Sequence, residues 1–175
     1  MSLARTRDSF EAFLERTLWG AGWVRLFLAC IPLALATFLV EDVVEAALDA
    51  VFSSPGFPGH MDEIKVRQSA NSWVGPLLVA PVLENLLCLF WVRVFAHKLG
   101  RSWWLVPCIV ALIAAAFHVA LYMEPRYASV FVDFFLMCCL IHNAKNRAVG
   151  FWASVFLHFL VNFIVLMQWR IFGIG

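Results

Sequence analysis

Six polar side chains interrupt the longest apolar stretches of the chain and could together do chemistry. Four are ionisable and two are carboxamides: Glu84, His118, Asp133 and His158, with Asn85 and Asn162. Ionisable groups inside apolar membrane segments are costly, and their presence there indicates a functional site. We therefore predict that these side chains converge on one site. A single buried histidine is otherwise more often a hydrogen-bonded core residue.

Their types suit the hydrolysis of an amide by water. A carboxylate such as Glu84 beside a neutral imidazole such as His118 can hold and deprotonate a water molecule. His158 and Asn162 are four residues apart, so they share one helix face. Side by side they can donate hydrogen bonds to an oxyanion as it develops. No Gly-x-Ser-x-Gly and no His-Glu-x-x-His motif points to a serine nucleophile or a zinc protease.

The remaining members of the set leave two alternatives open. Two histidines with carboxylates could bind a metal, but the asparagine and the spread over four segments suit a metal poorly. We predict a site without metal or cofactor. Asn85 and Asp133 are expected in supporting roles, with Asp133 either supplying a second carboxylate or making a hydrogen bond between packed helices.

Composition defines the elements that must hold this site. The 175-residue chain is 63% hydrophobic and 14% charged, with a mean hydropathy of +0.83. Soluble domains are about 45–50% apolar, and a small chain cannot hide so much apolar surface. The composition predicts an all-α, polytopic membrane helical bundle in contact with the lipid bilayer. A net charge of +1 gives no indication of nucleic-acid binding.

Five segments are apolar and long enough to be membrane spans, given that a spanning helix needs about 20 residues. A charged segment before them, residues 1–20, has apolar residues at helical spacing and is predicted to be an amphipathic helix at the membrane surface. We expect a single membrane domain over 1–175. The spans are predicted at about 23–40, 74–92, 103–123, 127–141 and 149–169. The first either ends at Val40 or continues past the acidic Glu41 and Asp42.

The basic residues orient the predicted bundle. With the N-terminus in the cytoplasm, nine Lys and Arg residues lie inside and four outside, in agreement with the positive-inside rule. The loop 43–72 is then external, either as a tether or as a lid over substrate. The five cysteines all fall in apolar segments without a Cys-x-x-Cys spacing, and we expect reduced, packed thiols.

Three stretches resemble the motifs of the CPBP family, which comprises CAAX proteases and bacteriocin-processing intramembrane endopeptidases and is also called Abi. The stretches are "APVLENLLCLFWVR", "AAAFHVALY" and "VGFWASVFLHFLVNFI", and the similar region covers about 74–170. The family motifs are Glu-Glu-x-x-x-Arg, Phe-x-x-x-His and His-x-x-x-Asn, in that order. The resemblance implies that Glu84 and His118 activate water, and that His158 and Asn162 stabilise the oxyanion.

The chain departs from the family pattern at three positions. Asn85 replaces the second glutamate, Leu89 replaces the arginine, and Ala114 replaces the aromatic residue, with Phe117 adjacent to the histidine instead. Arg93 lies one turn after Leu89, near the expected membrane surface. Because the site would already lack a second carboxylate, an aspartate at position 85 is expected to be tolerated or to alter activity only mildly.

The resemblance implies an intramembrane glutamic endopeptidase acting on a membrane-anchored protein or peptide. We expect it in the bacterial inner membrane, with the myxosortase group as the most similar kind of processing enzyme. The departures favour a second hypothesis, a non-catalytic scaffold, chaperone or immunity protein that binds a membrane partner. A small ion or solute carrier is a third, disfavoured because the chain has no inverted repeat.

Overall fold

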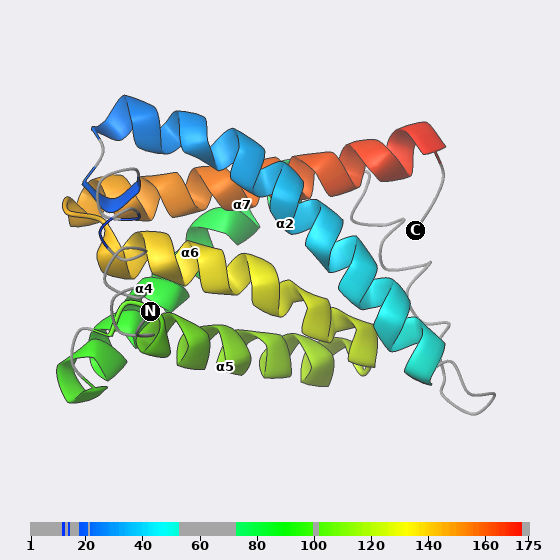
Figure 1. The fold of residues 1–175 in the computed structure, drawn as a ribbon. Coiled ribbons are helices and arrows are strands. Elements are labelled where there is room, and N and C mark those ends of the chain that lie inside the picture. The colour runs from blue at the N-terminus through cyan, green and yellow to red at the C-terminus, as the bar shows by residue number, and fades with distance from the viewer. Residues whose placement is uncertain are drawn as a thin grey trace, which may run out of the picture.

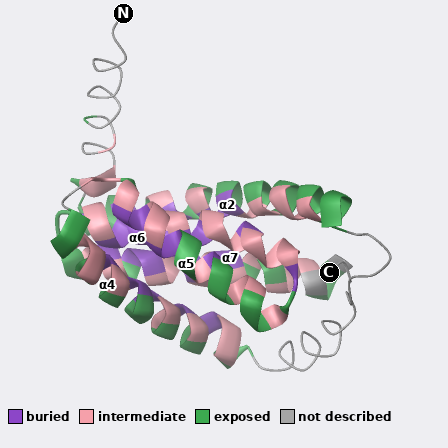
Figure 2. Ribbon diagram, turned by 90° about the horizontal axis from the view of Figure 1, so that it is seen from below, coloured by how far each residue is buried: buried purple, intermediate pink, exposed green. Residues whose placement is uncertain are grey.

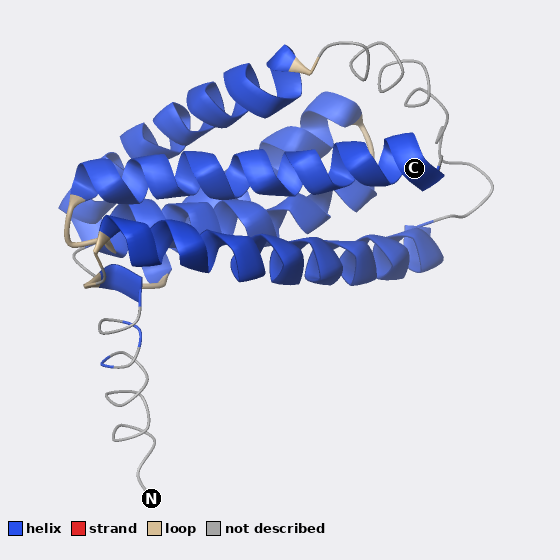
Figure 3. Cartoon of the chain, turned by 90° about the horizontal axis from the view of Figure 1, so that it is seen from above, coloured by secondary structure: helices blue, strands red, loops and turns tan. Residues whose placement is uncertain are grey.

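In the computed structural model the chain is a bundle of long helices (Figure 1). The structure describes residues 12, 14, 18–20, 22–52, 73–99 and 102–172. Within these ranges every secondary-structure element is a helix, and no strand occurs (Figure 3). The predicted surface helix over 1–20 lies mostly outside the described residues.

Five helical segments in the described ranges are long and apolar enough to cross a membrane. Two of them begin with a differently wound turn, π-helical in one and 3₁₀ in the other. The prediction of an all-α membrane bundle is therefore confirmed, and the chain is a multi-pass membrane protein. The elements are α2 (Trp23–Phe52), η2 (Gly75–Val79) leading into α4 (Ala80–Leu99), α5 (Leu105–Tyr122), η3 (Pro125–Val130) leading into α6 (Phe131–Asn143), and α7 (Arg147–Phe172).

The first helix continues past the acidic pair, the longer of the two alternatives that the sequence left open, and this corrects the predicted start of the first loop. α2 continues through the acidic pair after Val40 and ends at Phe52. The part of the predicted loop from 43 to 52 is therefore helix, and the rest of it, 53–72, lies outside the described residues. The continuation "EDVVEAALDAVF" contains neither glycine nor proline, and residues of moderate or good helix propensity do not end a helix. At about 1.5 Å per residue, this helix exceeds a hydrocarbon core about 30 Å thick.

The fourth segment is also longer than its predicted range, because it includes the η3 turn that starts at Pro125. The reversal before it occurs at Met123, whose φ of 58° is left-handed and ends α5. Such a residue is a common way to end a helix. The tight reversal lays α6 directly against α5.

α6 forms the centre of the bundle. It lies between α5 and α7 in Figure 1 and also contacts α4 and α2. With seven buried residues it has more than any other helix among the described residues, and its buried stretch is visible in Figure 2. The apolar core around it includes Leu26, Val106, Met137 and Leu157, each no more than 1% exposed. All five cysteines are free, and four of them are buried in this interior.

Gly150 sets the approach of α7 to the end of α6. A Cβ at this position would lie 2.5 Å from the Leu140 carbonyl oxygen and 2.6 Å from the Ala144 Cβ. Neither neighbour can move away easily, since one is backbone and the other is a short side chain on the backbone. The glycine therefore permits the close contact that fixes where the following turns of α7, including His158, face the bundle.

Candidate functional site

Three of the predicted site residues meet inside the bundle, each from a different helix. The Oε2 atom of Glu84 on α4 lies 4.0 Å from Nε2 of His118 on α5 and 3.9 Å from Nε2 of His158 on α7. These separations are too long for direct hydrogen bonds. They suit one bridging water between each pair. The Glu84 side chain is 33% exposed and that of His158 is 7% exposed, so the carboxylate is the accessible member.

The ring of His118 is oriented by its own helix. Its Nδ1 lies 2.8 Å from the carbonyl oxygen of Ala114, one turn earlier. A carbonyl oxygen only accepts hydrogen bonds, so Nδ1 carries the proton in this contact. In the neutral ring, the lone pair is then on Nε2, the atom that faces Glu84. A water between the two residues can donate one O–H to the carboxylate and the other to this nitrogen.

Phe134 contacts the rings of both histidines and was not identified from the sequence. Its ring centroid lies 5.1 Å from that of His118 and 6.1 Å from that of His158, and the residue is buried. Phe117, which the sequence suggested as the aromatic neighbour of His118, makes an edge contact but is 59% exposed on the outside of the bundle. Nothing distinguishes Phe134 among the chain's 17 phenylalanines until α6 is placed between α5 and α7.

Asn85 faces the interior beside Glu84 and contacts His158. Its Nδ2 lies 2.7 Å from the Pro81 carbonyl oxygen and 3.3 Å from Nδ1 of His158. Leu89, at the position where the family has arginine, packs against the apolar core, whereas Arg93 is exposed. Of the three departures on α4 and α5, Asn85 is therefore the one that reaches the site.

Asn162 is one turn beyond His158 on α7, but its side chain bonds to the backbone before α4 and not to the Glu–His–His cluster. Its Nδ2 donates to the Pro76 carbonyl oxygen at 2.8 Å. In the π-helical register, where Ala80 N–H bonds to Gly75 O, the next donor would be the N–H of residue 81. That residue is proline, which has no N–H. The Asn162 amide replaces the missing donor and ties α7 to the start of the α4 segment.

Asp133 lies at the edge of the site without direct contact to the histidines. It is 5% exposed, and its Oδ1 accepts no hydrogen bond from the described residues. Its backbone N–H donates to Oε1 of Glu41 on α2 at 3.3 Å. Glu41 was not among the candidate site residues that the sequence predicted. The continuation of α2 as an uninterrupted helix is the signal that would have found it.

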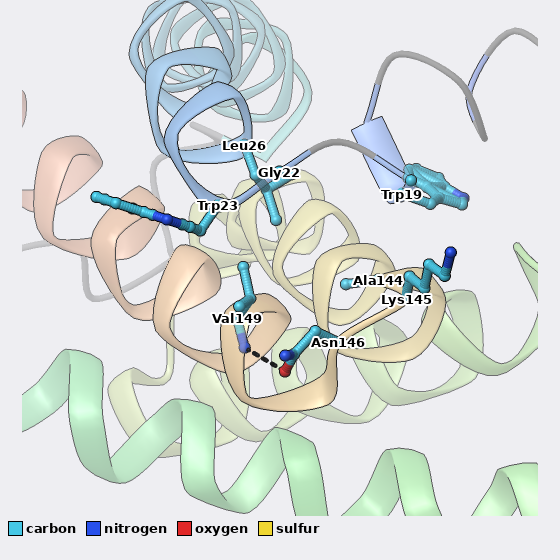
Figure 4. Close-up of a pocket in the computed structure, with 9 residues that line it drawn as sticks. Trp19, Gly22, Trp23, Leu26, Ala144, Lys145, Asn146 and Val149 are labelled. Atoms are coloured by element: carbon cyan, nitrogen blue, oxygen red, sulfur yellow. Dashed lines mark hydrogen bonds between the residues drawn. The ribbon is translucent and has the colours of Figure 1, made fainter.

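Two other features of the described residues bear on the site. No three His, Cys, Asp or Glu side chains among them are grouped as metal ligands would be. A hollow of about 220 Å³ lies at the other end of the bundle, between the start of α2 and the turn from α6 to α7 (Figure 4). Its wall includes Trp19, Trp23 and Lys145, with the Asn146 side chain accepting from the N–H of Val149.

The fold and this cluster define the class as a multi-pass, all-α membrane bundle with a Glu–His–His cluster within its helices. No family model, curated protein or solved structure matches the chain.

Proposed function

We propose that the chain is an intramembrane endopeptidase that hydrolyses a peptide bond of a membrane-anchored protein or peptide. The observation that carries this proposal is the meeting of Glu84 with Nε2 of both His118 and His158, at 4.0 and 3.9 Å. A carboxylate and a neutral imidazole nitrogen at this separation are arranged to accept both protons of one water. The resemblance to the CPBP family at these residues adds support.

In the proposed reaction Glu84 takes a proton from the bridging water as its oxygen attacks the peptide carbonyl carbon. The C–O bond forms, and the carbonyl π electrons move to oxygen, where His158 and Asn162 donate hydrogen bonds. The C–N bond then breaks, and the leaving amine takes the proton that Glu84 holds. His118 orients the water through Nε2, held in place by its Nδ1 bond to Ala114. The products are a carboxylic acid and an amine, with no covalent enzyme intermediate.

One observation favours the second hypothesis, a non-catalytic membrane scaffold. The Asn162 amide already bonds the Pro76 carbonyl, so this residue has a structural role that needs no substrate. A primary amide carries two N–H groups, so the second remains for an oxyanion. Both readings of Asn162 can therefore hold together, and the hydrolytic proposal is retained as the better supported of the two.

The proposed location is the bacterial inner membrane with the N-terminus in the cytoplasm. The starts of α2 and α7 and the ends of α4 and α6 share one end of the bundle, as alternating spans require (Figure 1). Single cysteines placed at position 60 and position 145, in a chain whose native cysteines are replaced, should report opposite sides. In intact cells, we expect a membrane-impermeant thiol reagent to label the cysteine at position 60 and not the one at position 145. Labelling of position 145 instead would reverse the orientation.

The proposed chemistry makes a prediction about metal removal and thiol modification. The experiment incubates the chain, reconstituted in lipid vesicles, with membrane proteins from source cells that lack it, and maps new protein termini by mass spectrometry. Because neither a metal nor a cysteine takes part in the proposed steps, chelators and thiol alkylation should leave the yield of new termini unchanged. Loss of processing in a chelator, restored by adding back one metal ion, would contradict the metal-free mechanism.

A further inference from the structure

The orientation of the Asn85 amide is fixed by its own helix. The residue is fully buried, and the atom 2.7 Å from the Pro81 carbonyl oxygen must be a donor, because that carbonyl can only accept. The amide nitrogen therefore occupies this place. The reversed orientation would bring two acceptor oxygens into contact.

This orientation determines what His158 can do with its Nδ1. The second N–H of the Asn85 amide is available to His158 Nδ1, 3.3 Å from the amide nitrogen. A hydrogen bond there requires a lone pair on Nδ1, so the proton of the neutral ring must be on Nε2. That Nε2 is the atom 3.9 Å from Glu84 Oε2, on the side of the ring where the bridging water would lie.

The arrangement leaves a polar atom without a partner. The Oδ1 of Asn85 is buried and accepts no hydrogen bond from the described residues. An unsatisfied buried carbonyl carries a free-energy cost that an apolar side chain would avoid, as Leu89 does one turn later on α4. A residue that only filled space at position 85 would not need this amide.

We infer that Asn85 is a positioning residue that keeps His158 in the tautomer with its proton on Nε2, directed toward the Glu84 side of the site. An imidazole held this way donates a hydrogen bond from Nε2, as an oxyanion requires. The tautomer itself follows from geometry alone, whereas its use in hydrolysis rests on the proposed function. At the position of the second glutamate in the CPBP motif, this chain has Asn85, whose amide N–H groups are hydrogen-bond donors.

The geometry reverses the expectation for Asn85→Asp that the sequence motif suggested. An ionised aspartate has no N–H to donate and accepts a hydrogen bond from an Nδ1–H group instead. His158 would then change to the tautomer protonated on Nδ1 and present a lone pair on Nε2. The aspartate variant should therefore be impaired rather than tolerated.

The test is nitrogen NMR of the full chain in detergent micelles with ¹⁵N-labelled histidine, at a pH where the ring is neutral. Signals of His158 are assigned by their loss in His158→Gln. In the wild-type chain Nε2 should be protonated and Nδ1 unprotonated. The reverse pattern would overturn the inference, with no variant and no substrate needed.

Asn85→Asp should move the His158 proton to Nδ1. The matched control is Asn143→Asp, which removes an amide that donates to the carbonyls of Trp103 and Cys139 at the other end of α6. That variant should leave the His158 signals unchanged. An unchanged His158 tautomer in folded Asn85→Asp would show that Asn85 does not set it.

Processing of membrane substrates is the second readout. Loss of an oxyanion donor lowers the rate by about 10²–10³-fold, which we expect for Asn85→Asp and not for Asn143→Asp. A changed tautomer with an undiminished rate would overturn the link to hydrolysis while leaving the tautomer assignment intact. If the wild-type chain processes nothing, the proposed function fails and the NMR result still decides the inference.

Discussion

Replacing Glu84 with glutamine is expected to lower the rate of peptide-bond hydrolysis by about 10²–10⁴-fold, the usual contribution of a general acid–base group. The substitution keeps the shape of the side chain and its ability to form hydrogen bonds. It removes the basic carboxylate that takes the proton of the bridging water. The Oε2 atom of this carboxylate lies 4.0 Å from Nε2 of His118 and 3.9 Å from Nε2 of His158. The measurement is the rate of appearance of new termini in reconstituted vesicles.

A suitable control for Glu84→Gln is Asp42→Asn. This change also neutralises a carboxylate within a long helix, but Asp42 is on α2 and exposed. Asp42→Asn should process at the wild-type rate. If Glu84→Gln does so too, while folded and stable, the glutamate is not the base and the scaffold hypothesis becomes the better explanation of the cluster.

Asn162→Ala is expected to have the second large effect, a loss of about 10²–10³-fold in rate from removal of an oxyanion donor. It also removes the hydrogen bond to the Pro76 carbonyl, so a loss of stability of about 0.5–1.5 kcal/mol is expected in thermal unfolding. The two consequences are measured separately, by the cleavage assay and by the unfolding of the detergent-solubilised chain.

Thr37→Val separates a structural role of Asn162 from a catalytic one. The Thr37 hydroxyl is buried on α2 and donates to the Leu33 carbonyl at 2.8 Å, away from the site. The variant loses one hydrogen bond to a backbone carbonyl with little change in shape. It should lower stability without slowing processing. If Asn162→Ala behaves in the same way, Asn162 serves only to hold the start of α4.

The sequence was sufficient to predict the fold class and the meeting of three of the four ionisable residues, for a physical reason. Membrane helices must be long and apolar, so their number follows from composition, and polar side chains in them must find partners inside the bundle. Glu84, His118 and His158 lie at compatible depths on separate spans. Helices packed in alternating directions bring such residues together.

The details that escaped prediction depend on three-dimensional contacts or on local backbone winding. Asn162 shares a helix face with His158, but its partner is set by the π-helical turn before Pro81, which no hydrophobic pattern reveals. Phe134 contacts both histidines only because α6 is central. Glu41 contacts Asp133 because α2 continues as helix past the acidic pair, one of two alternatives that the sequence left open.

Asn85 illustrates a different limit. From the sequence it is a missing carboxylate, and the chemical expectation was that an aspartate would be tolerated. In the structure it is a donor whose two N–H groups are directed to Pro81 and His158. Whether position 85 presents a donor or an acceptor to His158 depends on the Pro81 carbonyl one turn earlier, which fixes the orientation of the Asn85 amide.

The most direct test of the central claim, that Glu84 and His118 act on one water, is a double-mutant cycle in the cleavage assay. The rates of wild type, Glu84→Gln, His118→Ala and the double variant are compared. Groups that act as a unit have strongly non-additive effects. We expect the double variant to be about as slow as the slower single variant. Effects that multiply would contradict a shared water and separate the two residues into independent roles.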